Sequence, residues 1–151
     1  ALERNPRDAP AYEGLGRVYY KLKDYDKAIA NFNKAASLIT KKGGDYDMQI
    51  AYDSLGWAYL RQNDYPKSLE YFNNALKEHD VFKTTYIGMA FIYYKQKKLE
   101  DSQAMINKAL SISNEWPHTH IDPYLPKSFV ECMKEKDYSS KNVVTCIEIT
   151  N

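Results

Sequence analysis

Residues 51–78 read AYDSLGWAYLRQNDYPKSLEYFNNALKE, and this stretch occurs three times in the chain with changes. Residues 11–38 repeat it as AYEGLGRVYYKLKDYDKAIANFNKAASL, and residues 85–112 repeat it as TYIGMAFIYYKQKKLEDSQAMINKALSI. The starts of the copies lie 40 and then 34 residues apart, and the six extra residues fall near Gly43 and Gly44. Self-similarity at a nearly fixed period predicts a repeat architecture with a loop inserted after the first copy.

Each copy is predicted to be two amphipathic helices joined by a short turn. In the first copy, Tyr12, Leu15 and Tyr19 recur at the spacing of one helical face. A second apolar stripe, Ala28, Phe32 and Ala35, follows the turn. Small residues at equivalent places are expected to let the two backbones of each pair approach closely. They are Gly16, Gly56 and Ala90 on the first helices, and Ala28, Ser68 and Ser102 on the second helices.

This order of residues resembles the tetratricopeptide repeat family over about residues 9–114. The resemblance rests on an aromatic residue, Leu-Gly and Tyr in the first helix, followed by Ala, Phe and Ala in the second. The third copy departs from the pattern, because Met89, Ala90 and Ile106 replace the usual Leu, Gly and Phe. The resemblance implies an all-α, right-handed superhelical solenoid of antiparallel helix pairs. In such proteins the first helices line a concave surface that binds extended or helical segments of protein partners.

We expect a single array over residues 1–151, and the repeat period sets its divisions. They are the tail of a preceding repeat (1–8), repeat one (9–42), a loop insertion (43–48), repeat two (49–82), repeat three (83–116), a loop (117–123) and a degenerate fourth repeat or C-terminal cap (124–151). The tail is inferred from Ala1-Leu2 and Asn5-Pro6, which indicate a fragment or processed form of a longer array. As an alternative, residues 143–149 are rich in β-branched residues and could form a strand or an irregular cap.

The predicted partner-binding residues are those offset from the core stripe of each first helix, and we call them the first-helix face. They are Arg17, Tyr20, Lys21, Asp53, Trp57, Leu60, Arg61, Ile87, Phe91, Tyr94 and Lys95, with Glu13 beside Arg17. Tyr20, Trp57, Phe91 and Tyr94 would form an aromatic floor with Trp57 as its main anchor, and Lys21, Arg61 and Lys95 a basic ladder. The alternatives are that the aromatic residues pack between repeats and that the lysines form a solvated rim.

One subfamily makes a specific test possible. Tetratricopeptide co-chaperones hold a C-terminal carboxylate with Lys and Asn in the first repeat, Asn in the second, and Lys and Arg in the third. The matching positions here are Glu13, Arg17, Ser54, Thr84 and Gly88. The clamp is absent, so an internal hydrophobic or aromatic segment is expected as the ligand instead of a chain terminus.

Other functions find little support in the sequence. The formal net charge of +1 gives no general electrostatic reason to bind nucleic acid, which is not expected as a partner, and no apolar run suggests a membrane span. His118 and His120 alternate in a loop without the further ligands of a metal site, so no metal and no cofactor are predicted. Cys132 and Cys146 are expected to be buried thiols, with a disulfide as the alternative.

The sequence therefore predicts a non-catalytic protein–protein interaction scaffold. Two other functions remain open, namely a self-associating assembly scaffold and a regulatory or targeting arm of a larger enzyme. The compartment is not encoded, although a cytoplasmic location is favoured.

Overall fold

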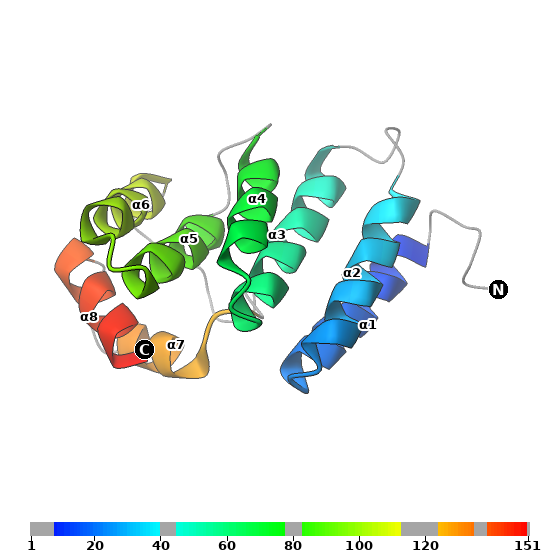
Figure 1. The fold of residues 1–151 in the computed structure, drawn as a ribbon, viewed down its shortest axis with the longest axis horizontal. Helices are drawn as coiled ribbons and strands as arrows, with labels where there is room; N and C mark the ends of the chain where they lie inside the picture. Colours follow the sequence, from blue (N-terminus) through cyan, green and yellow to red (C-terminus); the bar gives the residue numbers. More distant parts are fainter. Residues whose placement is uncertain (1–7, 40–44, 78–82, 113–123, 135–138, 151) are drawn as a thin grey trace. The chain divides into compact units, whose positions relative to one another are not determined.

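The computed structural model describes residues 8–39, 45–77, 83–112, 124–134 and 139–150. These residues form eight helices and no strand, joined in part by short turns (Figure 1). The all-α fold predicted from the repeats is confirmed. The chain divides into two compact units, residues 1–80 and residues 81–151, and each is described separately.

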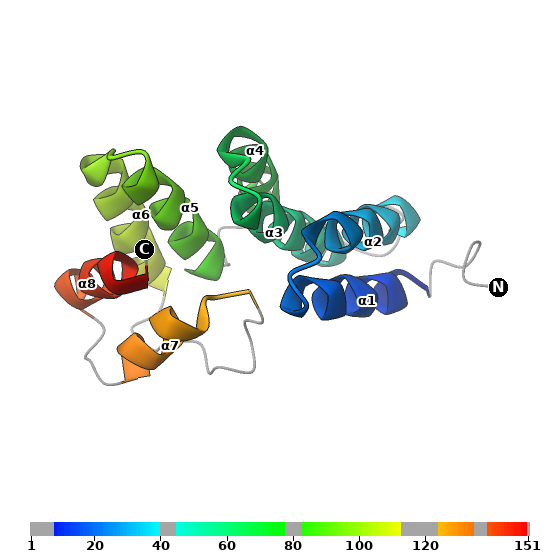
Figure 2. The same ribbon diagram turned by 60° about the horizontal axis from the view of Figure 1, so that its bottom comes forward.

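The first unit contains two helix pairs. Its helices are α1 (Ala9–Lys21), α2 (Tyr25–Leu38), α3 (Asp45–Arg61) and α4 (Tyr65–Leu76). The partners α1 and α2 lie side by side, as do α3 and α4, and α2 also packs against α3 (Figures 1 and 2). The two pairs therefore pack together, and α2 contacts both first helices.

The turn inside each pair has the same backbone conformation at one residue in all three copies. Lys23, Asn63 and Lys97 have positive φ values of 63°, 61° and 59°. The next residue in the first two copies is Asp24 or Asp64, which accepts a hydrogen bond at 3.3 Å from the backbone N–H three residues later. An aspartate at this position satisfies a donor that the first turn of a helix leaves unpaired, so it fixes where α2 and α4 begin.

A glycine facing a phenylalanine sets the distance between the helices of the first two pairs. A Cβ on Gly56 would lie 2.3 Å from Cδ1 of Phe72, and one on Gly16 would lie 2.4 Å from Cε1 of Phe32. Both rings are fully buried. In the second pair, Ser68 Oγ also donates a hydrogen bond to the Gly56 carbonyl at 2.6 Å. The close approach predicted from the small residues is confirmed at this crossing.

The second unit begins with the third repeat and ends with a less regular pair. Its helices are α5 (Lys83–Lys95), α6 (Leu99–Ile112), α7 (Lys127–Lys134) and α8 (Ser140–Thr150). The partners α5 and α6 pack together, and Ser102 Oγ donates to the Ala90 carbonyl at 3.0 Å as its equivalent does in α4. The last helix, α8, packs against both α6 and α7.

Three expectations about local structure are corrected. Residues 143–149 lie within α8, so the alternative of a strand is wrong, because a helix lets Val143, Cys146 and Ile147 share one buried face. The predicted loop at 43–48 overlaps α3, which begins at Asp45, since no helix-breaking residue follows Gly44. Gly43 and Gly44 themselves lie outside the described residues.

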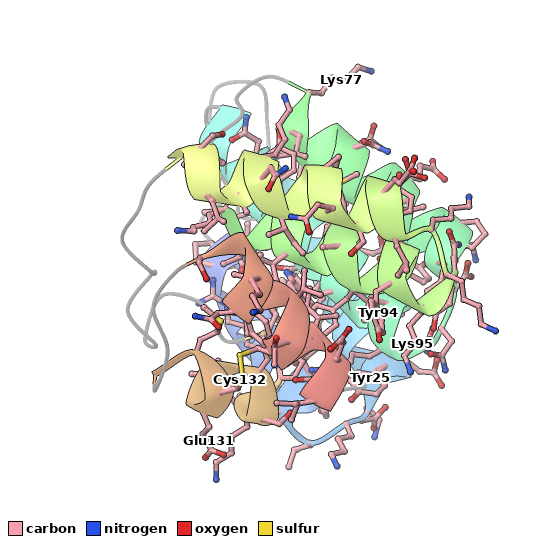
Figure 3. All side chains as sticks on the ribbon, turned by 90° about the vertical axis from the view of Figure 1, so that its left-hand side faces the viewer. Tyr25, Lys77, Tyr94, Lys95, Glu131 and Cys132 are labelled. Carbon is pink, nitrogen blue, oxygen red and sulfur yellow. A yellow bond between two sulfur atoms is a disulfide. The ribbon has the colours of Figure 1, made fainter. Side chains whose placement is uncertain are left out.

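The third correction concerns the cysteines, which form a disulfide and are not free thiols. Cys132 on α7 and Cys146 on α8 are bonded, with their Cα atoms 5.6 Å apart (Figure 3). The bond closes a short loop that ties these two helices together. Spacing in the sequence does not reveal this pairing, because it depends on how α7 and α8 face each other.

Candidate partner-binding face

In the first unit, α1 and α3 carry the first-helix face, and Glu13 joins the two helices. Glu13 Oε1 accepts hydrogen bonds from Arg17 Nε at 3.1 Å and from Nη2 at 2.7 Å. The same oxygen accepts from Ser54 Oγ on α3 at 3.3 Å. Glu13 and Ser54 occupy two of the carboxylate-clamp positions, so an anionic group stands where that clamp would require a cation.

A second contact joins the C-terminal ends of the same two helices. Arg61 Nε donates to the hydroxyl of Tyr20 at 2.8 Å, and the guanidinium carbon lies 5.9 Å from the centroid of the Tyr20 ring. Tyr20 itself is only 6% exposed and packs edge-on against Tyr25. Tyr20 thus holds Arg61 in place and presents little ring area to solvent.

Trp57, which was expected to be the main anchor, lies in the core. Its side chain is 0% exposed, and its ring packs edge-on against Phe72 with centroids 5.6 Å apart. The indole Nε1 has no hydrogen-bond partner among the described residues. Asp53, one helical turn earlier, is 8% exposed. An aromatic floor that is open to solvent is therefore not present at Trp57.

The accessible members of this face in the first unit are mostly cationic. Lys21 is exposed, and the Arg17 side chain is 45% exposed. Leu60 and Arg61 are partly exposed at the end of α3. The Tyr20–Arg61 hydrogen bond joins the C-terminal ends of α1 and α3, and Arg17 is ion-paired with Glu13. We call Arg17, Lys21, Leu60 and Arg61 of these two helices the basic edge.

In the second unit, α5 carries the rest of the predicted face. Ile87 is 0% exposed and Phe91 is 5% exposed, and the Phe91 ring packs edge-on against Phe129 of α7 with centroids 5.3 Å apart. Tyr94 is partly exposed and Lys95 is exposed at the end of α5 (Figure 3). A residue of the chain itself therefore covers the aromatic position at Phe91.

Two features of these surfaces escaped the sequence analysis. Phe129 belongs to a segment outside the three clear copies, so the repeat pattern gave no sign of its contact with Phe91. The other feature is a tyrosine stack on the α3–α4 pair, in which the rings of Tyr59 and Tyr71 are parallel to within 5° at 5.4 Å. Burial, and then the nearby Tyr59, raise the pKa of Tyr71. The sequence hints at this stack only through its 14 tyrosines.

One lysine among the described residues is buried. Burial lowers the pKa of Lys83, at the start of α5, where the residue is 6% exposed. Within the described residues, no three His, Cys, Asp or Glu side chains gather as a metal site would require. His118 and His120 lie outside the described residues. None of the described helices is both long and apolar enough to span a membrane.

Comparison with known proteins agrees with this architecture. Two models of the tetratricopeptide repeat match the chain, one over residues 7–77 and the other over residues 54–114. No curated protein matches it. The matched residues cover all three copies and both helices of each pair. The chain belongs to the tetratricopeptide repeat family.

Proposed function

We propose that the chain is a protein–protein interaction scaffold that binds a segment of a partner protein on its first-helix face. Tetratricopeptide repeats generally serve as protein-binding modules and not as catalytic ones. The observation that carries the proposal is the basic edge of the first unit, in which Arg17, Lys21, Leu60 and Arg61 are all at least partly exposed on α1 and α3. Such an edge fits an extended or helical segment with an apolar side chain flanked by acidic ones.

The position of Glu13 argues that the ligand is an internal segment and not a chain terminus. Glu13 is hydrogen-bonded to both Arg17 and Ser54, so its carboxylate is fixed where a terminal carboxylate would have to bind. A terminal carboxylate at this position would be repelled by the carboxylate of Glu13. A ligand terminus is therefore disfavoured at the site that the co-chaperones use for it.

A competing explanation for the cations is structural. Lys21, Arg61 and Lys95 all lie in the last turn of a first helix, where a positive charge interacts favourably with the helix dipole. That explanation predicts that charge reversal changes stability alone. The proposed function predicts a change in binding as well, so the two can be separated.

The test compares Arg17→Glu/Lys21→Glu with the wild-type chain and with Lys141→Glu. Lys141 is an exposed lysine on α8, outside the first-helix face, and so serves as the matched control. Each protein is used to capture partners from a lysate of the source organism, and the affinity of the captured partner is then measured by calorimetry. We expect the double variant to lose at least about tenfold in affinity, equivalent to about 1.4 kcal/mol, while the control binds like wild type.

Circular dichroism establishes that the variants remain folded. If the basic edge is the site, the affinity of the wild type should fall as ionic strength rises. The affinity of the double variant should fall less. Equal capture by all three proteins would rule the edge out as the binding surface.

A further inference from the structure

An apolar stripe on α1 has no partner among the described residues. It consists of Ala11, Gly14, Leu15, Val18 and Leu22, all of which are exposed. Leu15 is 41% exposed, Val18 is 52% exposed and Leu22 is 69% exposed. The spacing of these residues puts them on one face of α1, away from the residues that pack on α2. We call this the outer stripe.

The equivalent face of α3 shows what normally covers such a stripe. Its residues are Ala51, Ser54, Leu55 and Ala58, which correspond to the first four residues of the outer stripe and are at most 1% exposed. Outside its own pair, α3 packs mainly against α2, the second helix of the preceding repeat, and Ser54 also bonds to Glu13 of α1. The same four register positions are thus buried in the second repeat and exposed in the first.

The outer stripe is also more apolar than its buried counterpart. Two polar residues of the second repeat bond across to the first. Ser54 of α3 bonds to Glu13, and Gln62, directly after α3, bonds to Asp26 at 2.6 Å. The equivalent residues of the first repeat are Gly14 and Leu22. The terminal repeat of an array normally presents a polar outer face to water. In this chain the first repeat instead has apolar residues where the second repeat has polar ones, which favours a surface that another helix covers.

We propose that the outer stripe is a docking site for the second helix of a further tetratricopeptide repeat that lies outside these 151 residues. The occupant is an amphipathic helix with small and apolar residues on one face, seated on α1 as α2 is seated on α3. A second copy of this chain offers no such helix among its described residues. The other large apolar side chains that are exposed there are isolated, Leu99 and Ile112 at opposite ends of α6 and Ile149 on α8.

The first experiment supplies such a helix in trans. The probe is a fluorescent peptide with the sequence of residues 24–39, DYDKAIANFNKAASLI, titrated with the full chain and followed by anisotropy. We expect saturable binding that weakens at least about tenfold in Val18→Lys. Leu99→Lys is the matched control, because it places the same charge on an exposed apolar residue of the second unit. Lys21→Glu should bind the peptide normally, which separates this site from the first-helix face.

The second experiment supplies the helix in cis, because a short isolated peptide is only marginally helical. Ten residues copied from 65–74, YPKSLEYFNN, are fused ahead of Ala1. With residues 1–8 they reproduce the 18 residues between the start of α4 at Tyr65 and the start of α5 at Lys83. We expect the fusion to raise the melting temperature of the wild-type chain and to raise it less in the Val18→Lys background.

Two outcomes would overturn the proposal. In the first, the fusion leaves the melting temperature unchanged, and Val18→Lys does not affect binding of the peptide. The other is a wild-type chain that sediments as a dimer while Val18→Lys sediments as a monomer, since the occupant would then be a second copy.

Discussion

At the scale of single residues, the third repeat differs from the other two by a matched pair of changes. Gly56 faces Phe72 in the second repeat, and the corresponding residues of the third repeat are Ala90 and Ile106, both fully buried. A Cβ at residue 56 would overlap the phenylalanine ring, whereas the smaller isoleucine leaves room for the Cβ of Ala90. The departures of the third copy from the family pattern therefore compensate one another.

This pairing predicts the effect of exchanging the residues. Gly56→Ala should destabilise the first unit by about 1–3 kcal/mol, because the added methyl group displaces a buried ring. The double variant Gly56→Ala/Phe72→Ile should lose less unfolding free energy than the sum of the two single variants, by about 0.5–3 kcal/mol. The smaller isoleucine side chain leaves room for the added methyl group. Urea unfolding of the two single variants and the double variant measures this coupling.

Gly14 provides the control for the same substitution. A Cβ on Gly14 would meet no atom within 4 Å. Gly14→Ala should therefore stabilise α1 by about 0.5–1 kcal/mol through helix propensity alone. If the losses of unfolding free energy in Gly56→Ala and Phe72→Ile simply add in the double variant, the Phe72 ring does not limit how closely α3 and α4 approach.

At the scale of whole helices, the start of α6 reverses the charges found at the starts of α2 and α4. Asp24 pairs with Lys27 at 3.0 Å, and Asp64 pairs with Lys67 at 3.6 Å. Hydrogen bonding to Lys27 lowers the pKa of Asp24, as expected for a carboxylate that caps a helix. In the third repeat the corresponding residues are Lys98 and Asp101. A lysine cannot accept a hydrogen bond from the backbone, so α6 lacks this side-chain cap.

Restoring the usual order should stabilise the second unit. In Lys98→Asp/Asp101→Lys, the new aspartate can accept from the backbone N–H of residue 101, and the pair keeps its net charge. We expect the melting temperature of this unit to rise by about 2–5 °C. Lys98→Asn/Asp101→Lys, which keeps a capping side chain without the charge, should retain part of the gain. A melting temperature below that of wild type in both variants would contradict the capping argument.

The helices could be predicted from the sequence because their signals are local. The stripes at helical spacing, the turn before Asp24 and the small residue at Gly56 each involve a few neighbouring residues or one repeat unit. Burial of Trp57 could not be predicted in the same way, because an aromatic residue at that position suits either a core or a binding surface. The contact of Phe129 with Phe91 and the pairing of the cysteines depend on a segment that does not follow the repeat.

At the scale of the whole molecule, the chain divides into two compact units, Ala1–Asp80 and Val81–Asn151. The Cys132–Cys146 disulfide belongs to the second unit alone and encloses about 15 residues. A cross-link of that loop length stabilises the folded state by about 3 kcal/mol, because it restricts the unfolded chain. The first unit has no covalent link of this kind among its described residues.

Reduction should therefore affect the two units differently. We expect Cys132→Ser/Cys146→Ser to lower the free energy of unfolding of the second unit by about 3 kcal/mol. The transition of the first unit can be followed by the fluorescence of Trp57 in a Trp116→Phe background, which leaves one tryptophan. Its midpoint should stay at the value of the oxidised chain. Equal shifts of both transitions would mean that the units unfold together.

The division at Asp80 also bears on the order in which the protein is made. Every helix of the first unit lies ahead of residue 81, so its packing partners are all synthesised before the second unit begins. At about 5–20 residues per second, translation of the 71 residues of the second unit takes about 4–14 s. Helical domains with mainly local contacts fold in microseconds to milliseconds. The first unit can therefore fold while the second unit is still being translated.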